Sequence, residues 1–405
     1  MKKINVILAA LTLFGLMTGC NSNKSQNATD ETQTVAETTE ITMTLNAENK
    51  VKFSLGGNQT ATIDWGDGSP VETVTLNTDD EEYAHRYTKP AEYTIQITGE
   101  NITTFDCSYI KITNIELNAP TLTCLDCSQN QIKTLDISKI PMLKELNCYS
   151  NPLTTLDISK NQKMEKLKCM YTQLTDLDIS KNTALKELDC YGNQFKTLDI
   201  SKNTALEDLS CSSNQLTHLD VSKNTALTQL HCYGNQLTSI DVSKNSNLIH
   251  LTCDKNELTS LDVSKNNALM NLNCDNNQLK TIDVSKNMAL KWLNCSGNQL
   301  KTLDVSKNSA LEILGCKGNQ LTSLDLSNKD KLEQINCENN QLSTQALNVL
   351  FNSLSDCGYG ATLFITGNPG ADDCDWSIAE EKGWSKEYIN RSEGDIDYSN
   401  LEDEE

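Results

Sequence analysis

The sequence has little positive charge. Its 405 residues include 34 lysines and arginines against 55 aspartates and glutamates, and the formal net charge at pH 7 is −21. Residues 1–19 contain two lysines and no acidic residue, so the chain without them has a net charge of −23. A chain this acidic repels the phosphate backbone of nucleic acids and anionic lipid headgroups. We therefore expect no nucleic-acid partner.

The sequence also lacks the motifs of the common catalytic sites. It contains no nucleophile elbow, no metal-binding motif and no recognisable pair of catalytic acids. We predict that the protein is not an enzyme and that it needs no cofactor or metal. An extracellular enzyme that acts on surface glycans is the alternative of that kind.

Long apolar runs are absent as well, apart from one at the N-terminus. Residues 1–20, MKKINVILAALTLFGLMTGC, combine a basic start, an apolar stretch and small residues before a cysteine, as a secretory signal does. The apolar stretch is short for a membrane span. Its end, L-M-T-G-C, resembles the lipobox of bacterial lipoproteins, with Met17 where leucine is usual. The resemblance implies a signal peptide at 1–19, cleavage before Cys20, and lipid on the sulfur of Cys20.

Residues 20–40 contain almost no large apolar side chain. They cannot build a core, so we predict a lipidated, disordered tether. Asn21 follows the cysteine, and no aspartate stands there to signal retention in the inner membrane. We therefore predict an exported lipoprotein, anchored to the membrane through Cys20, at the outer membrane or the cell surface. Whether it faces the periplasm or the exterior stays open.

The main feature of the chain is a 21-residue repeat, seen in residues 185–205 as LKELDCYGNQFKTLDISKNTA. Its cysteine recurs eleven times at this interval, as Cys127, Cys148, Cys169, Cys190, Cys211, Cys232, Cys253, Cys274, Cys295, Cys316 and Cys337. A fixed period in this range is typical of a solenoid. The unit, L-x-x-L-x-C-x-x-N-x-L-x-x-L-D-(V/I)-S-x-N-x-x, resembles the leucine-rich repeat family, whose core is L-x-x-L-x-L-x-x-N/C-x-L.

Each repeat has two halves, and both follow a period of two. In the first half Leu188 and Cys190 point inward and Tyr191 outward; in the second half Leu198 points inward. Neither half is long enough for a helix of normal length. We predict a β-rich leucine-rich repeat solenoid over residues 101–342, with short strands on both sides of each coil. Equal widths on the two sides predict a gently twisted rod and no deep horseshoe.

The region before the solenoid alternates short strand patterns with turn residues. One segment reads I-D-W-G-D-G and a later one H-R-Y-T-K-P-A-E-Y-T-I. They resemble the W/F-G-D-G turn and the H-x-Y…Y-T-V close of the PKD-type β-sandwich, which implies a small PKD-like β-sandwich at 41–100. We assign Asp64 and Asp67 to turn chemistry, with a bound cation as the alternative. We assign His85 to packing or hydrogen bonding.

The period ends near residue 342. After it, QALNVLFNSL places apolar side chains on one helical face, and ATLFITGNPG is typical of a strand that ends in a turn. We predict a small α/β cap over 343–390 that covers the last coil, and an acidic tail at 391–405. Cys357 and Cys374 lie in this cap and are candidates for a disulfide.

The cysteine column admits three interpretations. Stacked coils place one thiol per layer in a row, which does not suit the convergent ligands of a metal site. Coils stand about 4.8 Å apart, whereas a disulfide needs Cβ atoms about 3.8 Å apart. We favour buried, inert cysteines that fill a leucine position, with scattered disulfides as the alternative. The asparagines of C-x-x-N and S-x-N are predicted to close the turns and to stack as ladders.

The two outward faces differ in how much they vary between repeats. The second half repeats Thr or Ser, Asp and Ser nearly unchanged. We assign this second-half face to stacking, with a calcium ladder as the alternative. The outward first-half positions change at every coil and include residue types that anchor interfaces. The candidate ligand-binding residues on this first-half face are Tyr149, Met170, Tyr191, His231, Tyr233, His250 and Trp292.

These features favour an anchor, a spacer and a binding region in one chain. The resemblance to bacterial surface leucine-rich repeat proteins implies adhesion or recognition. We predict a monomeric, lipid-anchored surface protein that binds a protein or a glycan through the first-half face. A structural spacer of the cell envelope, with a merely tolerant solvent face, is the alternative. His231 and His250 could approach each other across adjacent coils, but no third group indicates a zinc site or catalysis.

Overall fold

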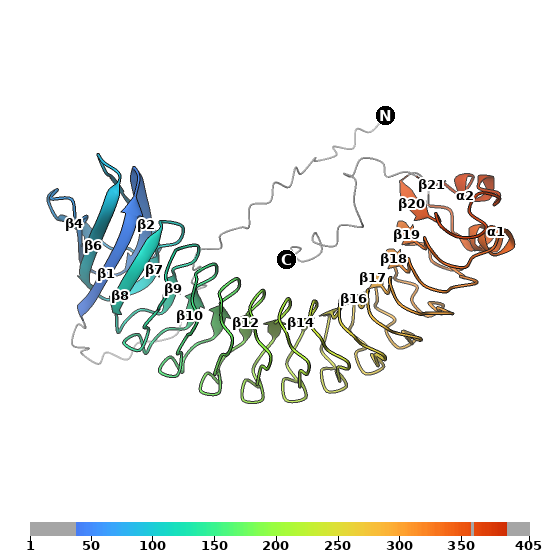
Figure 1. The fold of residues 1–405 in the computed structure, drawn as a ribbon, viewed down its shortest axis with the longest axis horizontal. Coiled ribbons are helices and arrows are strands. Elements are labelled where there is room, and N and C mark those ends of the chain that lie inside the picture. Colours follow the sequence, from blue (N-terminus) through green and yellow to red (C-terminus); the bar gives the residue numbers. More distant parts are fainter. Residues whose placement is uncertain (1–37, 358–359, 387–405) are drawn as a thin grey trace. The chain divides into compact units, whose positions relative to one another are not determined.

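The computed structural model describes residues 38–357 and 360–386 (Figure 1). Cys20, the predicted signal peptide, nearly all of the tether and the acidic tail lie outside the described residues. The chain divides into two compact units: residues up to 132 with 139–148, and residues 133–138 with those from 149 onward. In the described part of the chain, no helix has the length and apolar character needed to cross a membrane.

The first unit contains two sheets. Its strands are β1 (Thr38–Ala47), β2 (Lys50–Gly57), β3 (Thr60–Asp64), β4 (Glu72–Thr75), β5 (Glu81–Arg86), β6 (Ala91–Glu100), β7 (Ile102–Asp106), β8 (Ile112–Asn118), β9 (Cys124–Asp126) and β10 (Glu145–Asn147). One sheet is antiparallel, in the order β4-β3-β6-β1-β8. In the other, β2 pairs antiparallel with β5 and β7, while β7, β9 and β10 are parallel. The change from antiparallel strands to parallel coils therefore falls inside this unit.

An aromatic cluster fills the first unit beside the I-D-W-G-D-G turn. Trp65 is fully buried, with its ring centroid 5.2 Å from that of Phe53. The Tyr87 hydroxyl donates to the carbonyl oxygen of Trp65 at 2.7 Å. His85 stacks on Trp65 with centroids 5.0 Å apart, and its Nε2 lies 2.8 Å from Oδ2 of Asp67. These contacts agree with the turn and packing roles predicted for Asp67 and His85.

The two sheets of the first unit continue beyond residue 100, where the sequence predicted a boundary. β7 and β8 follow it at once and complete the two sheets, since β7 pairs with β2 and β8 pairs with β1. The apolar side chains of both strands, including Phe105 and Ile115, are buried. The imperfect repeats after residue 100 belong to the first unit because they supply strands to both of its sheets.

The second unit is a stack of 21-residue coils, which confirms the predicted solenoid. Its short strands are β11 (Lys166–Lys168), β12 (Glu187–Asp189), β13 (Asp208–Ser210), β14 (Gln229–His231), β15 (His250–Thr252), β16 (Asn271–Asn273), β17 (Trp292–Asn294), β18 (Ile313–Gly315) and β19 (Gln334–Asn336). Neighbouring strands are parallel and pair equivalent residues, as Leu188 with Leu209. The central leucines are buried, so every coil contributes the same layer to one continuous core.

The second half of each coil differs from the prediction of a second strand. In the described coils the strands occupy the first half alone. Local hydrogen bonds replace a ladder: Ser201 N donates to Oδ1 of Asp199 at 2.9 Å, and Asn203 N donates to the carbonyl oxygen of Ile200 at 3.0 Å. Asp, Ser and Asn compete in this way with regular strand pairing. Within the second unit the coils follow an arc with the strands on its inner side, and not the predicted rod (Figure 1).

The cap follows the last coil. It contains α1 (Thr344–Ser353), β20 (Ala361–Phe364), α2 (Ser377–Glu380) and β21 (Trp384–Ser385). Ser343 caps α1 by accepting from Ala346 N, and the helix buries Leu347 and Phe351 as its apolar pattern predicts. β20 adds to β19 in parallel, so the cap continues the strand layer before it ends.

Candidate recognition surface

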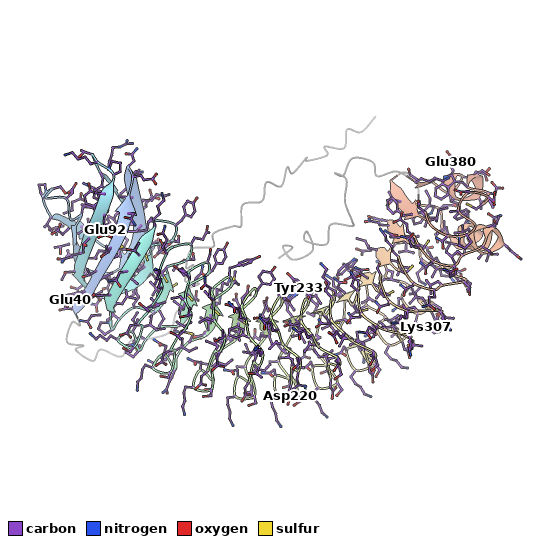
Figure 2. The ribbon with its side chains drawn as sticks, in the orientation of Figure 1. Glu40, Glu92, Asp220, Tyr233, Lys307 and Glu380 are labelled. Carbon is purple, nitrogen blue, oxygen red and sulfur yellow. The ribbon has the colours of Figure 1, made fainter. Side chains whose placement is uncertain are left out.

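The strands arrange outward side chains of the first-half face in columns. Strands of adjacent coils pair in register, so equivalent positions lie side by side, about 4.8 Å apart. The column one residue after the cysteine contains Met170, Tyr191, Ser212, Tyr233, Asp254 and Asp275. Figure 2 shows Tyr233 on this face and Asp220 on the second-half face, at opposite sides of the stack.

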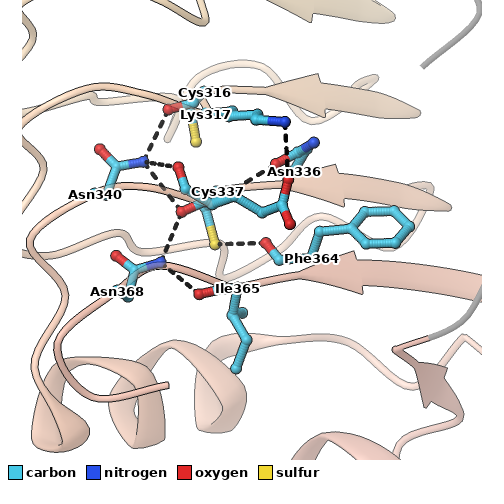
Figure 3. A network of polar contacts seen from close by, with 9 residues as sticks. Cys316, Lys317, Asn336, Cys337, Asn340, Phe364, Ile365 and Asn368 are labelled. Carbon is cyan, nitrogen blue, oxygen red and sulfur yellow. Dashed lines mark hydrogen bonds and ion pairs between the residues drawn. The ribbon is translucent and has the colours of Figure 1, made fainter. Parts of the chain in front are cut away.

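Asparagine ladders hold these columns in place (Figure 3). The Nδ2 of Asn340 donates to the carbonyl oxygen of Cys337 in its own coil and to that of Cys316 in the preceding coil, at 3.1 and 2.9 Å. Its Oδ1 accepts from Leu321 N at 3.0 Å. Asn368 makes the same bond to Cys337, at 2.9 Å, from within the cap. The segment I-T-G-N of the cap is thus one more coil, with Ile365 in the cysteine position, which the sequence analysis missed.

The eleven column cysteines fill the interior behind this face. All are 0% exposed, and the structure joins none of them in a disulfide. Burial raises the pKa values of thiols in this column, to about 12 for Cys211 and Cys295. The sulfur of Cys190 lies 3.3 Å from the carbonyl oxygen of Ser210 in the next coil. This arrangement agrees with the prediction of buried, inert thiols.

A column of left-handed residues turns the chain away from each strand. The residue two after the cysteine has a positive φ in every coil, for example 67° at Gly192, 50° at Ser213 and 64° at Gly234. Tyr171 occupies this position with a φ of 48°. An aromatic residue in this region is strained by about 1–2 kcal/mol, and such strain is concentrated at functional sites. Tyr171 is 54% exposed.

Tyr171 completes a row of four tyrosines, which we name the tyrosine row. Its ring centroid lies 6.0 Å from that of Tyr149 and 4.9 Å from that of Tyr191, and Tyr191 lies 5.9 Å from Tyr233. A Cβ on Gly192 would come within 3.0 Å of the Tyr171 ring, so this glycine makes room for it. Three members of the row were predicted from the sequence, but Tyr171 was not, because the period-two pattern does not extend to its position. The signal was the one tyrosine among the residues two positions after the eleven column cysteines, where the others are Gly, Ser, Asn, Gln and Lys. Tyr109 stands at the same offset from Cys107, with a φ of 60°.

The hydroxyls of the row interact with one another. Hydrogen bonds from Tyr171, Ser213 and Tyr233 lower the pKa of the Tyr191 phenol. The bond to Tyr191, together with burial, raises the pKa of Tyr171 to about 12. The row is therefore a linked set of aromatic faces and hydroxyls, and its members come from the coils of four different cysteines.

His231 and His250 lie on adjacent strands, as predicted. Nδ1 of His231 lies 3.0 Å from Oγ1 of Thr252. Burial, and then the charge of His250, lower the pKa of His231 to about 4, so His231 is neutral at physiological pH. Among the described residues no group of three or more His, Cys, Asp or Glu could hold a metal ion.

A pair of carboxylates follows the tyrosines in the same column. Asp254 is 6% exposed, and Asp275 occupies the equivalent position in the next coil. Burial, and then repulsion by Asp275, raise the pKa of Asp254 to about 7. Burial likewise raises the pKa of Asp189, which stands beside Tyr191 in the first-half face. This stretch of the face therefore holds negative charge that is poorly solvated.

Two predicted anchors differ from the expectation of large outward surfaces. Trp292 is 5% exposed and stands between Asn271 and Ile313 on the neighbouring strands. The indole is therefore buried at the sheet surface and does not offer a large outward area. Met170 is half-buried between the coils of Tyr149 and Tyr191.

The second-half face shows the uniformity that the repeat predicts. Asp178, Asp199 and Asp220 each accept a bond from the backbone N–H of the serine two residues on, at 2.9 Å. Those bonds lower the pKa values of these carboxyls. Grooves between coils occur on this face, one lined by Asp178 and His218 and another by Asp304 and Asp325.

The cap cysteines are not joined. The sulfur of Cys357 contacts the carbonyl oxygen of Lys382 at 3.3 Å, and that of Cys374 contacts the carbonyl oxygen of Ala371 at 3.2 Å. The structure holds both as half-buried thiols and does not form the disulfide for which they were candidates.

No protein-family model and no curated protein matches the sequence. Solved structures do match. The functional domain of InlJ from Listeria monocytogenes, which includes a cysteine ladder, is 32% identical with a TM-score of 0.58; the match covers 72% of this chain and 60% of that one. The chain therefore spans less than two thirds of that domain.

Two further structures share the fold at lower identity. The internalin InlF from Listeria monocytogenes is 20% identical with a TM-score of 0.56, over 71% of this chain and 87% of that one. A chain from the octameric complex of Latrophilin 3, Unc5D and the leucine-rich repeats of FLRT2 is 18% identical with a TM-score of 0.53, over 65% and 89%. These likenesses show that the chain has the leucine-rich repeat solenoid fold.

Proposed function

We propose that this chain is a recognition protein held at a bacterial surface, and that the first-half face of its second unit binds a protein partner. The tyrosine row carries the proposal. Its rings are in mutual contact on a scaffold whose core and second-half face repeat from coil to coil. Tyr171 adopts a left-handed backbone conformation in this row. Tyrosine offers a large, stiff contact area with a polar end, which is why it is enriched among interface hot spots.

The N-terminal segment supports the surface location. A signal peptide at 1–19 would export the chain, and lipid on Cys20 would hold it in the membrane. Several acyl chains anchor a protein stably where a single chain does not. Residues 20–40 then act as the tether, and the PKD-like first unit lifts the solenoid away from the membrane.

A protein partner is favoured over the alternatives. Leucine-rich repeats of FLRT2 assemble with other proteins in the octameric complex matched above. A structural spacer would have no use for a row of aromatic rings in mutual contact on one face. An enzyme would need a nucleophile or an acid–base pair, and the sequence contains no recognisable motif for either.

Site-specific photo-crosslinking on cells tests the proposal. Benzoylphenylalanine replaces Tyr191 on the first-half face or, as the control, His218 on the second-half face. We expect a discrete adduct from position 191 that added wild-type protein competes away, and none from 218. Adducts from 218 alone, or from neither position while the protein is on the surface, would contradict the proposal.

A further inference from the structure

The proposed function leaves open the chemistry of the partner, and the first-half face constrains it. We propose that the segment between Tyr149 and Asp275 binds an extended protein segment that carries arginine side chains. This inference rests on the proposed function and specifies the ligand of the same face. Two observations carry it: the angles between the tyrosine rings, and the pair of adjacent carboxylates that follows the rings along the face.

The lysines at the start of the face are already paired. Nζ of Lys168 lies 3.1 Å from a carboxylate oxygen of Glu187, and Nζ of Lys166 lies 3.8 Å from the other. Glu187 thus takes up the positive charge of this part of the face. An anionic partner finds little accessible cation here, because both lysines point at a carboxylate of their own chain.

Two carboxylates stand side by side further along the face. Asp254 and Asp275 occupy equivalent positions in adjacent coils, and burial, mutual repulsion and a hydrogen bond between the two side chains raise the pKa of Asp254. Lys255 is the one cation next to them in the chain, and it lessens the repulsion without removing it, since the pKa of Asp254 still rises to about 7. A guanidinium between the two carboxylates would let both ionise, and its planar fork suits carboxylate geometry.

The ring angles favour a cation over a sugar. The planes of Tyr171 and Tyr191 are 81° apart, those of Tyr149 and Tyr171 58°, and those of Tyr191 and Tyr233 43°. No two neighbouring rings make the flat platform on which a pyranose would stack. Faces at steep angles instead form a corrugated surface that can surround a cation, and arginine uses such faces more often than lysine does.

The spacing fits a short extended peptide. The coils from Tyr191 to Asp275 are separated by four strand intervals of about 4.8 Å, or about 19 Å in all. An extended chain rises about 3.3 Å per residue, so about six residues span this distance. Alternate side chains of such a segment would point at the face. Those at one end would contact the tyrosines, and those at the other end would contact the aspartates.

Fluorescence anisotropy with labelled hexa-arginine, hexa-lysine and hexa-glutamate tests the inference on the full mature chain at pH 8. The tyrosine variant combines Tyr171→Gly, Tyr191→Ala and Tyr233→Ala. The charge variant combines Asp254→Asn and Asp275→Asn, and its matched control removes two charges from the other face, Asp199→Asn and Asp220→Asn. We expect hexa-arginine to bind several-fold more tightly than hexa-lysine, and hexa-glutamate not to bind. The tyrosine and charge variants should each lose tenfold or more in affinity, and the control less than twofold, with circular dichroism confirming that all are folded.

Two outcomes overturn the inference. If the control loses as much affinity as the charge variant, the peptide responds only to the net charge of the chain. If hexa-lysine binds as well as hexa-arginine and the tyrosine variant binds both normally, the rings play no part. A random peptide library selected on the wild type separates this failure from that of the proposed function. If the selected peptides depend on the tyrosines but lack arginine, the arginine-bearing ligand is refuted and the proposed function stands. If no selected peptide depends on the tyrosines and position 191 gives no adduct, both the inference and the proposed function are refuted.

Discussion

Thr172 donates its hydroxyl to Oδ1 of Asn193 at 2.6 Å, and this bond occupies the place of a rung in the asparagine ladder. In the other coils an asparagine stands at this position and its Oδ1 accepts a backbone N–H of the preceding coil, as Asn214 accepts from Phe195. Thr172 offers no such carbonyl. Leu153 N, which would be the donor, turns to the carbonyl oxygen of Asn151 at 2.8 Å. The irregular coil is the one that carries Tyr171.

Thr172→Asn should restore the rung and stabilise the protein. The new side chain would offer Oδ1 to Leu153 N and Nδ2 to the carbonyl oxygen of Cys169. A net buried hydrogen bond contributes about 1 kcal/mol, so the melting temperature should rise. Asn214→Thr is the matched reverse change and should lower it. A lower melting temperature for Thr172→Asn would show that the coil is built around the threonine.

The column cysteines should react together or not at all. Each is fully buried, and burial raises the pKa of thiols such as Cys190 and Cys253, so the native state offers neither access nor thiolate. Thiol labelling of the native protein should be slow, and denaturant should expose about eleven sites in one transition. Mass spectrometry after pulse labelling counts them. Fast native labelling of any column cysteine would contradict this expectation.

The repeat was predictable and the departures from it were not. A period of 21 residues specifies the core leucines, the cysteine column and the first ladder, because each coil presents the same chemistry to the next. The prediction of a second strand in each coil was wrong, because local hydrogen bonds at Asp199 and Asn203 take the place of a strand ladder. Tyr171 was missed because its outward direction depends on a positive φ, which no alternation of apolar residues encodes. The burial of Trp292 depends on the neighbouring coils, which its own repeat does not specify.

Cys20 is predicted to carry the membrane anchor. Cys20→Ser removes the sulfur that would take the lipid, and uncleaved or unlipidated protein should leave the membrane fraction. Fractionation followed by immunoblotting measures this, with Cys357→Ser as a control that keeps the lipobox intact. Retention of the Cys20→Ser protein in the membrane fraction at the wild-type level would contradict the anchor.

Asp254 should make stability depend on pH in one window. Its folded pKa, about 7, lies above the ordinary aspartate pKa of 3.8, so the native state binds more protons than the unfolded state between these values. Stability therefore falls as the pH rises from about 4 to 7, by up to about 1.4 kcal/mol per pH unit. His231, with a folded pKa of about 4, acts in the opposite direction between pH 4 and 6.5.

Comparison of Asp254→Asn with the wild type isolates the carboxyl from the histidine. The variant should melt at a temperature close to that of the wild type at pH 4.5, and at a clearly higher one at pH 8. His231 contributes equally to both proteins, so it cancels in the difference. A difference in melting temperature that stays constant across this range would show that the Asp254 carboxyl does not titrate as described.

The two faces of the solenoid should respond in opposite ways to substitution. The tyrosine variant of Tyr171→Gly, Tyr191→Ala and Tyr233→Ala removes exposed ring surface, and glycine relieves the strain at position 171, so melting should change little. Each true anchor among the three should cost about 2 kcal/mol or more of partner binding. Trp292 is left in place because its indole is packed.

Substituting Asp199, Asp220 and Asp241 by Ala should do the reverse. Each change removes the acceptor of a backbone N–H that closes a turn, at 2.9 Å in all three coils, so the melting temperature should fall while binding remains. Calorimetry and binding measured on the same preparations give both readings. If the aspartate variant lost the partner while the tyrosine variant kept it, with both proteins folded, recognition would lie on the second-half face. The repeated Asp and Ser of that face would then bind a ligand with a repeating structure.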